Sequence, residues 1–261
     1  MQTPIGIFDS GIGGTSIWRE ISTLLPKENT IYLSDSYNAP YGEKSTEKII
    51  EFSIKNTELL VKKDCKLIVV ACNTATTNAI EILRKTYKVP FIGIEPAIKP
   101  AALITKTNSI GILATKGTLS SSLFSKTAGL FVSNIKVTEQ VGTGLVQLIE
   151  SGKLHSTEMT LLLNKILTPM QENNIDSLVL GCTHYPYLIP QIQKIMGKEV
   201  QIIDSGLAVA KQTKAILKQL QLTTTSKDSG LHQFYSNTNV TVLQTILNNL
   251  NANYTIDTLD F

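Results

Sequence analysis

The chain has 261 residues, a length that suits one large domain or two small ones. Hydrophobic residues make up 42% and charged residues 17%, a balance that excludes a disordered chain too polar to form a core. The net charge of +3 is spread without a basic block, and no apolar run or amino-terminal segment has the pattern of a membrane span or signal peptide. We therefore expect a cytoplasmic globular protein whose partners are neither nucleic acid nor membrane.

Short β-branched runs alternate with amphipathic runs along most of the chain. Such alternation predicts βαβ units, and runs that are apolar on both faces are typical of a parallel sheet covered by helices on both sides. Binding sites in these sheets lie beyond the carboxyl ends of the strands. The predicted strands cover 5–8, 30–33, 66–71, 89–94, 109–113, 177–180 and 200–203, and helical spacing marks 17–25, 49–60, 157–170 and 207–220.

A faint internal repeat divides the chain into two related halves. IGIFDSGIGG at 5–14 is echoed by IGILATKGT at 110–118, and LIVVACNT at 67–74 by SLVLGCTH at 177–184. Proline interrupts the pattern at 95–100, and the Thr- and Ser-rich segment 223–230 is typical of an exposed loop. We expect an α/β fold of two similar parallel-sheet domains related by a pseudo-twofold axis, with one cleft between them. The first comprises 1–94 plus 205–261, where HQFYSN is followed by the apolar segment 240–250, and the second comprises 95–204.

Two of the three cysteines occupy equivalent places in these halves. Cys72 and Cys182 each follow a predicted strand and precede a predicted helix, where helix-start N–H groups stabilise a thiolate, so the pattern predicts a lowered thiol pKa. The alternative is that they are buried small hydrophobic residues, the interpretation that we give Cys65. An odd number of cysteines without a CxxC pair favours reduced thiols over disulfides or a zinc ribbon.

Asp9 and Ser10 end the first strand and lead into a glycine-rich turn at 11–14. Backbone N–H groups in such a turn can hold an anion, although a tight turn with an Asp cap explains the glycines equally well. The segment is no dinucleotide fingerprint, because Ser16 stands where the third glycine is needed, and it lacks the GK[ST] of a P-loop.

Other polar residues give weaker signals of chemistry. His184 can act as a general acid or base, whereas Glu150, at the end of an amphipathic helix, is typical of a solvated surface charge. A zinc site made of Cys72, Cys182 and His184 lacks a standard ligand spacing, so we expect no metal. Asp35, with the loop residues after it, forms a further polar strand end.

The motifs IGIFDSGIGG, DSYNAPYG, VVACNTATT, IGIEPAIKPA and LVLGCTHYPYL, in this order over residues 5–188, resemble those of glutamate racemases. The resemblance implies two α/β domains that enclose the substrate and an isomerase that interconverts L- and D-glutamate without a cofactor. It further implies that the enzyme supplies D-glutamate for peptidoglycan, hence for cell wall synthesis and cell shape, and that it is a homodimer.

The resemblance also assigns roles to residues. It implies that Cys72 and Cys182 are the two proton-transferring thiols, assisted by Asp9, His184 and Glu150. Ser34 and Ser36 flank Asp35 where the family commonly has Gly and Thr, which puts the positioning of Asp35 in question. The residues that match the substrate-binding pattern are Asp9, Ser10, Asp35, Pro40, Tyr41, Gly42, Asn73, Thr74, Thr115, Thr118, Thr183 and His184.

The chemistry of racemisation accounts for a pair of thiols. Inversion at Cα needs one group to remove the proton from one face and another to deliver a proton to the opposite face. Three alternatives remain open at this point: an aspartate racemase of the same superfamily, a Cys–His thiol hydrolase that would not need Cys72, and an anion-binding regulatory module without turnover.

Overall fold

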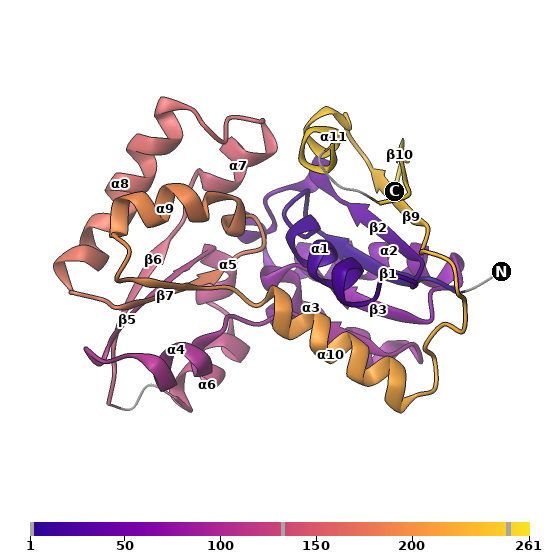
Figure 1. The fold of residues 1–261 in the computed structure, drawn as a ribbon, viewed down its shortest axis with the longest axis horizontal. Helices are drawn as coiled ribbons and strands as arrows, with labels where there is room; N and C mark the ends of the chain where they lie inside the picture. Colours follow the sequence, from indigo (N-terminus) through magenta and orange to yellow (C-terminus); the bar gives the residue numbers. More distant parts are fainter. Residues whose placement is uncertain (1–2, 132–133, 249–251) are drawn as a thin grey trace.

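The computed structural model describes residues 3–131, 134–248 and 252–261. These residues form two parallel β-sheets side by side, each with helices on both faces (Figure 1). The chain forms most of the first sheet, crosses to build the second, and returns to the first. The two sheets have matching cores, because the strand order β2-β1-β3-β4 of the first corresponds to β6-β5-β7-β8 of the second. The predicted fold class is confirmed.

The first sheet takes its strands from both ends of the chain. β1 pairs in parallel with β2 and β3, and β9 adds to the outer edge of β2 in the register Ser34 opposite Ser236. In spatial order the strands are β10 (Tyr254–Thr258), β9 (His232–Ser236), β2 (Thr30–Ser34), β1 (Ile5–Asp9), β3 (Leu67–Val70) and β4 (Phe91–Gly93).

The second sheet is built from a continuous part of the chain. Its strands are β6 (Lys136–Val141), β5 (Ser109–Ala114), β7 (Ser177–Gly181) and β8 (Gln201–Ile203), in that spatial order. This division of strands supports the boundaries expected above, in which 205–261 belongs with 1–94, and we retain those boundaries as a proposal.

Helices cover both faces of each sheet. On the first sheet, α1 (Thr15–Leu24) packs against α10 (Gly206–Gln219), and α2 (Thr46–Lys62) packs against α3 (Asn73–Thr86). On the second, α4 (Ile98–Ile104) contacts α6 (Ser122–Gly129), while α8 (Thr157–Glu172) contacts α7 (Leu145–Glu150) and α9 (Ile189–Met196). The remaining helices are α5 (Lys116–Leu119), α11 (Thr241–Leu247) and the 3₁₀ turns η1 (Ser36–Asn38), η2 (Tyr41–Glu43) and η3 (Tyr185–Leu188).

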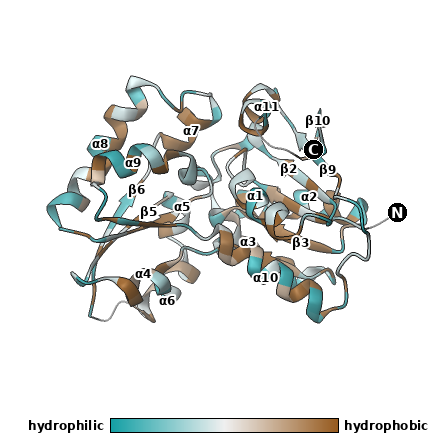
Figure 2. Ribbon diagram, viewed as in Figure 1, coloured by the Kyte–Doolittle hydropathy of each residue, from teal (hydrophilic) through white to brown (hydrophobic). Residues whose placement is uncertain are grey.

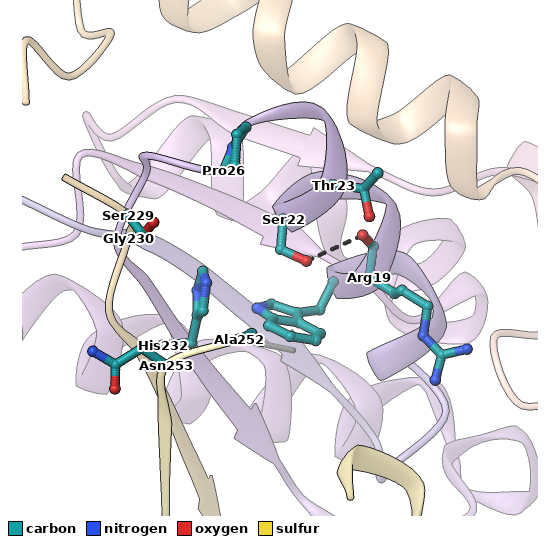
Figure 3. Close-up of a pocket in the computed structure, with 10 residues that line it drawn as sticks. Arg19, Ser22, Thr23, Pro26, Ser229, Gly230, His232, Ala252 and Asn253 are labelled. Atoms are coloured by element: carbon teal, nitrogen blue, oxygen red, sulfur yellow. Dashed lines mark hydrogen bonds between the residues drawn. The ribbon is translucent and has the colours of Figure 1, made fainter. Parts of the chain in front are cut away.

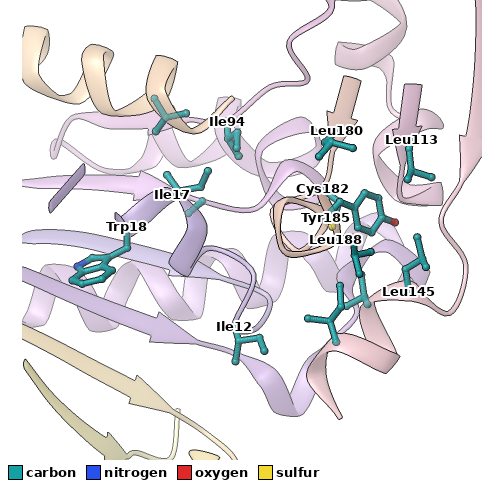
Figure 4. Close-up of a cluster of buried hydrophobic side chains, with 14 of the residues drawn as sticks. Ile12, Ile17, Trp18, Ile94, Leu113, Leu145, Leu180, Cys182, Tyr185 and Leu188 are labelled. Atoms are coloured by element: carbon teal, nitrogen blue, oxygen red, sulfur yellow. The ribbon is translucent and has the colours of Figure 1, made fainter. Parts of the chain in front are cut away.

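The amphipathic pattern of the helices explains this packing. α10 carries alternating hydrophobic and hydrophilic segments, as expected of a helix with one buried side (Figure 2). One hydrophobic cluster continues from the first half into the second, because Ile12 and Ile94 belong to the same cluster as Leu113, Cys182 and Tyr185 (Figure 4). The two sheets are therefore held together by buried apolar contacts near their facing ends.

The predicted strands and helices are found within a few residues of their expected bounds, but three strands of the structure were not predicted. β6 and β10 have mostly exposed or half-exposed side chains at the edges of their sheets, so they lack the continuous apolar run used as the signal. HQFYSN, noted only as a pattern, contains β9. Of the segment 240–250, residues 241–247 form α11, and residues 249–250 lie outside the described residues.

Candidate active site

Strand ends from both sheets surround one small enclosed cavity. It offers about 10 Å³ of space for the centres of water molecules. The wall contains both thiols that the repeat had singled out. The residues that line it are Ser10, Pro40, Tyr41, Gly42, Cys72, Asn73, Thr74, Thr115, Val146, Cys182, Thr183 and His184.

Cys72 stands between β3 and α3, as the sequence predicts. Its Sγ caps the helix by accepting the N–H of Ala75 at 3.4 Å, and it lies 3.7 Å from the hydroxyl of Ser10. The predicted lowering of its pKa is wrong for this closed form. Burial raises the pKa of the Cys72 thiol, the charge of Asp9 raises it further, and the hydrogen bonds with Ala75 and Ser10 offset only part of this.

Cys182 follows β7 on the opposite wall. Its side chain is buried, and its Sγ lies 3.8 Å from Nδ1 of His184. The predicted helix directly after it is wrong, because the chain enters η3, a four-residue 3₁₀ turn containing Pro186, before α9 begins. The Cys182 thiol therefore contacts the imidazole of His184, whereas the Cys72 thiol accepts a hydrogen bond from an amide at the start of a helix.

Glu150 holds His184 from the far side of the ring. Its Oε1 lies 2.6 Å from Nε2 of His184 and accepts the N–H of Ile12 at 2.7 Å. Burial alone would lower the pKa of His184, but hydrogen bonds to Cys182 and Glu150 raise that pKa well above its ordinary value. The prediction that Glu150 is a solvated surface charge is wrong, because its carboxylate bridges the two halves at the candidate site.

Asp9 is fully buried directly behind the cavity wall. Its Oδ2 accepts the N–H groups of Gly14 at 2.9 Å and Gly11 at 3.2 Å, and its Oδ1 accepts the hydroxyl of Thr183 at 3.2 Å. Burial raises the pKa of Asp9 to about 6, against the lowering effects of His184 and the turn amides. Asp9 thus lies where its charge acts on Cys72 and on the imidazole of His184, without itself lining the cavity.

The glycines of the turn at 11–14 make room for side chains of the second half. A Cβ on Gly11 would lie 1.9 Å from Oε1 of Glu150, and one on Gly13 would lie 2.2 Å from Nδ1 of His184. The amide nitrogen of Gly13 is 3.2 Å from Nε2 of His184. Since Nε2 of the protonated ring donates its proton to Glu150, it cannot also accept one from Gly13, so we interpret this contact as close packing and not as a hydrogen bond. The anion bound by this turn is therefore the Glu150 carboxylate of the protein itself.

Asn73 carries the clearest mark of a ligand-binding residue. It is buried on the cavity wall, yet among the described residues neither its amide nitrogen nor its amide oxygen has a hydrogen-bond partner. A buried amide without partners is costly unless a bound molecule supplies them. Its donor and acceptor suit the carboxylate and ammonium groups of an amino acid.

Three threonines form a hydroxyl cluster where the halves meet. Oγ1 of Thr74 lies 2.8 Å from that of Thr115 and 3.3 Å from that of Thr118. Thr115 lines the cavity, whereas Thr118 is fully buried behind it. The structure therefore brings Thr115 to the wall and leaves Thr118 in a supporting position.

Asp35 lies behind the wall and supports Tyr41. Its carboxylate accepts the Tyr41 hydroxyl, the amide of Asn38 at 2.8 Å and the amide of Asn237 at 2.5 Å. Burial raises the pKa of Asp35, and these hydrogen bonds lower it in part. Pro40, Tyr41 and Gly42 reach the cavity, but Asp35 does not. Sequence reasoning missed Asn237, because nothing in the sequence shows that this distant segment returns beside Asp35.

A second, larger cavity lies away from the thiols (Figure 3). Its volume, measured in the same way, is about 560 Å³, and it is lined by Trp18, Arg19, His232 and their neighbours. Trp18 Nε1–H donates to Thr30 Oγ1 at 2.9 Å, and Thr30 Oγ1 lies 3.0 Å from Nδ1 of His232. These buried polar groups bond to one another, so they serve the packing of α1 against β9.

The described residues contain neither a metal-binding cluster nor a membrane-spanning helix. Among residues 3–131, 134–248 and 252–261, no group of three or more His, Cys, Asp or Glu side chains is placed to hold a metal ion. Over the same ranges, no helix has the length and apolar character needed to cross a bilayer.

Comparison with known proteins adds independent observations. Residues 5–213 match the family model described as Asp/Glu/Hydantoin racemase. A glutamate racemase of Ectopseudomonas mendocina is 42% identical over 247 residues, which cover 94% of each chain. Another, from Ralstonia pickettii, is 48% identical over 80% of this chain and 74% of its own.

Solved structures agree with the sequence matches. Glutamate racemase RacE1 of Bacillus anthracis superposes with a TM-score of 0.87 at 31% identity, covering 99% of this chain and 98% of that one. The Escherichia coli glutamate racemase, solved with L-glutamate and the activator UDP-MurNAc-ala, gives 0.85 at 32% identity over the same shares.

Proposed function

Because the chain belongs to the Asp/Glu/hydantoin racemase family, we propose that it interconverts L- and D-glutamate, with Cys72 and Cys182 as the two bases. The observation that supports this most directly is the pair of thiols, each from a strand end of a different half, on the wall of one cavity. A single thiol could not serve both faces of Cα.

In each turnover, one cysteine as thiolate takes the proton from Cα, and the other as thiol delivers its proton to the opposite face. The protonation states of the two thiols are then exchanged, so the next turnover runs in the reverse sense or waits for their re-equilibration with solvent. The raised pKa of Cys72 makes its thiolate a strong base once formed, and the substrate ammonium supplies a positive charge beside it.

The surrounding groups stabilise the charge that grows as the proton leaves. The protonated imidazole of His184 keeps a donor against Sγ of Cys182, and Glu150 fixes that ring. The unpartnered amide of Asn73 can bond the substrate carboxylate, on which negative charge accumulates. The closed cavity has room for about one water molecule and keeps bulk water out, which strengthens these interactions.

We extend the proposal to the physiological setting. The enzyme works in the cytoplasm as a homodimer, without metal or organic cofactor, and supplies D-glutamate for peptidoglycan and hence for the cell wall. The resemblance of the motifs to those of glutamate racemases supports these statements.

The test is loss of the α-hydrogen of L-glutamate in deuterated water, followed by proton NMR together with optical rotation. We expect wild-type protein to exchange and racemise glutamate, and Cys72→Ala and Cys182→Ala each to lose racemisation by at least about 10³-fold. Cys65→Ala is the matched control, since Cys65 is buried outside the cavity and should keep full activity.

Three further arms separate the alternatives. Faster racemisation of aspartate than of glutamate would indicate an aspartate racemase. Turnover that survives Cys72→Ala would favour a thiol hydrolase. Binding of glutamate without exchange of its α-hydrogen would favour a regulatory module. We expect a chelator to leave the rate unchanged; a loss that zinc restores would contradict the metal-free proposal.

A further inference from the structure

A chain of hydrogen-bonded side chains leads from β2 of the first half to the thiol of the second. Oγ of Ser34 lies 3.0 Å from Oγ of Ser36, and Ser36 donates to Oε2 of Glu150 at 2.8 Å. Oε1 of Glu150 then bonds His184, whose Nδ1 lies 3.8 Å from Sγ of Cys182. Ser36 is therefore connected to one thiol through Glu150 and the imidazole.

The two oxygens of Glu150 have different partners. Oε1 is bound by the Ile12 amide and by the His184 ring, so that oxygen has a backbone donor to hold it. For Oε2, Ser36 is the one hydrogen-bond donor among the described residues. Both oxygens turn together about the last side-chain torsion, which is intrinsically broad, so losing the Ser36 hydroxyl also loosens the hold of Oε1 on the His184 ring.

We propose that Ser36 is a positioning residue for the reaction, acting through Glu150 and His184 on the Cys182 side of the cavity. This inference rests on the proposed function for its kinetic part. Ser36 lies outside the cavity wall and touches neither thiol, so it acts only through the carboxylate that it orients.

The charged groups around His184 determine how Ser36 can affect the pKa of that ring. Facing the ring are Glu150 from α7, Cys182 from the end of β7 and Asp9 from the end of β1. The carboxylate of Glu150 is bonded directly to Nε2 and favours the protonated ring. Loosening this carboxylate therefore lowers the pKa of His184, whereas Cys182 and Asp9 keep their places.

The kinetic test compares three variants. We expect Ser36→Ala to lower kcat/KM for glutamate about three- to tenfold, mainly through kcat, the scale of one ordinary intramolecular hydrogen bond. Ser36→Thr keeps the hydroxyl and should stay within about twofold of wild type. Ser236→Ala is the matched control: it removes a buried hydroxyl at the adjacent strand end that bonds within its own turn, at Thr238, and has no path to Glu150.

A second measurement does not depend on turnover. The chain has 3 histidines, so ¹⁵N-labelled histidine gives a spectrum simple enough to titrate each ring, and His184→Gln identifies its signal. We expect Ser36→Ala to shift the His184 titration to lower pH by at least about half a unit, with Ser36→Thr and Ser236→Ala unchanged. An unchanged titration in Ser36→Ala would overturn the proposal, as would a rise in KM alone, which would indicate that Ser36 only shapes the loop. Failure of the wild type to racemise would defeat the proposed function and leave this titration test intact.

Discussion

The two candidate bases have unequal surroundings, although the repeat places them at equivalent strand ends. Cys72 is bonded by an amide and a hydroxyl with Asp9 nearby, whereas Cys182 faces the imidazole of His184. By the family resemblance, Cys182 should take the proton from L-glutamate and Cys72 the proton from D-glutamate.

Replacing one cysteine by serine should therefore give a defect that depends on the enantiomer. A hydroxyl is much harder to deprotonate than a thiol, so the variant loses a base but keeps a polar group of similar size. Elimination from a β-chloro glutamate analogue needs only one proton abstraction. We expect Cys182→Ser to retain elimination from the D-analogue and lose it from the L-analogue, and Cys72→Ser to do the reverse; the inverted preference would show the face assignment to be wrong.

Burial of Asp9 has a consequence for stability. Its pKa rises from 3.8 to about 6 on folding, so the folded protein holds this proton more tightly than the unfolded chain. The associated stabilisation is fully present below pH 3.8 and is lost as the pH rises through about 6, with an upper limit of about 3 kcal/mol. Urea unfolding of wild type and Asp9→Asn at several pH values measures it. We expect the stability of the variant relative to wild type to increase from pH 4 to pH 6.5, and a constant difference would contradict the assignment.

At the scale of elements, the turn between β1 and α1 controls how closely the halves approach. Gly13→Ala would place a Cβ in contact with the ring of His184 and force that ring or the turn to move. Displacements of this kind near reacting groups cost roughly 10²-fold in rate, so we expect kcat/KM to fall about 10- to 100-fold. Gly129→Ala in α6 is the control, because its Cβ would meet nothing within 4 Å and activity should be unchanged. Activity near wild type in Gly13→Ala would show that the contact is not needed.

Sequence reasoning identified residues of the cavity wall where strong local patterns precede them. The thiols were found because buried strands end directly before them, and Thr183 with His184 follow in the same motif. It underestimated Glu150, whose partners Ile12, Ser36 and His184 come from distant segments, and it missed the edge strand β6, whose side chains are largely exposed. Helical or strand periodicity contains no information about such long-range contacts.

At the scale of the whole molecule, the described form is closed around its site. Contacts between the halves include Ser16 Oγ to the carbonyl of Thr183 at 2.9 Å and the Asn78 amide to the carbonyl of Gly117 at 3.2 Å. Space of about 10 Å³ for water centres is about that of one water molecule. A substrate of the size of glutamate therefore requires the halves to separate and close again.

Closure on a ligand should protect the two site thiols from alkylation. We expect saturating D-glutamate to slow iodoacetamide labelling of Cys72 and Cys182 at least about tenfold, because a ligand bound between the halves stabilises the closed state. Cys65 is buried outside the cavity and serves as the internal control, with an unchanged rate. Mass spectrometry of the labelled peptides reads all three cysteines in one experiment. Equal slowing at Cys65 would indicate global stabilisation, and no slowing at either site thiol would contradict closure on the ligand.

Because the chain returns to the first sheet, the two sheets become complete in a fixed order during synthesis on the ribosome. All strands of the second sheet, up to Ile203, are synthesised before β9 begins at His232. Until then β2 has a free hydrogen-bonding edge, the kind of edge that pairs with strands of other chains. During synthesis, the second sheet can therefore assemble before the first sheet is complete. The first sheet is completed only when the later segment pairs with this edge and brings Asn237 to Asp35.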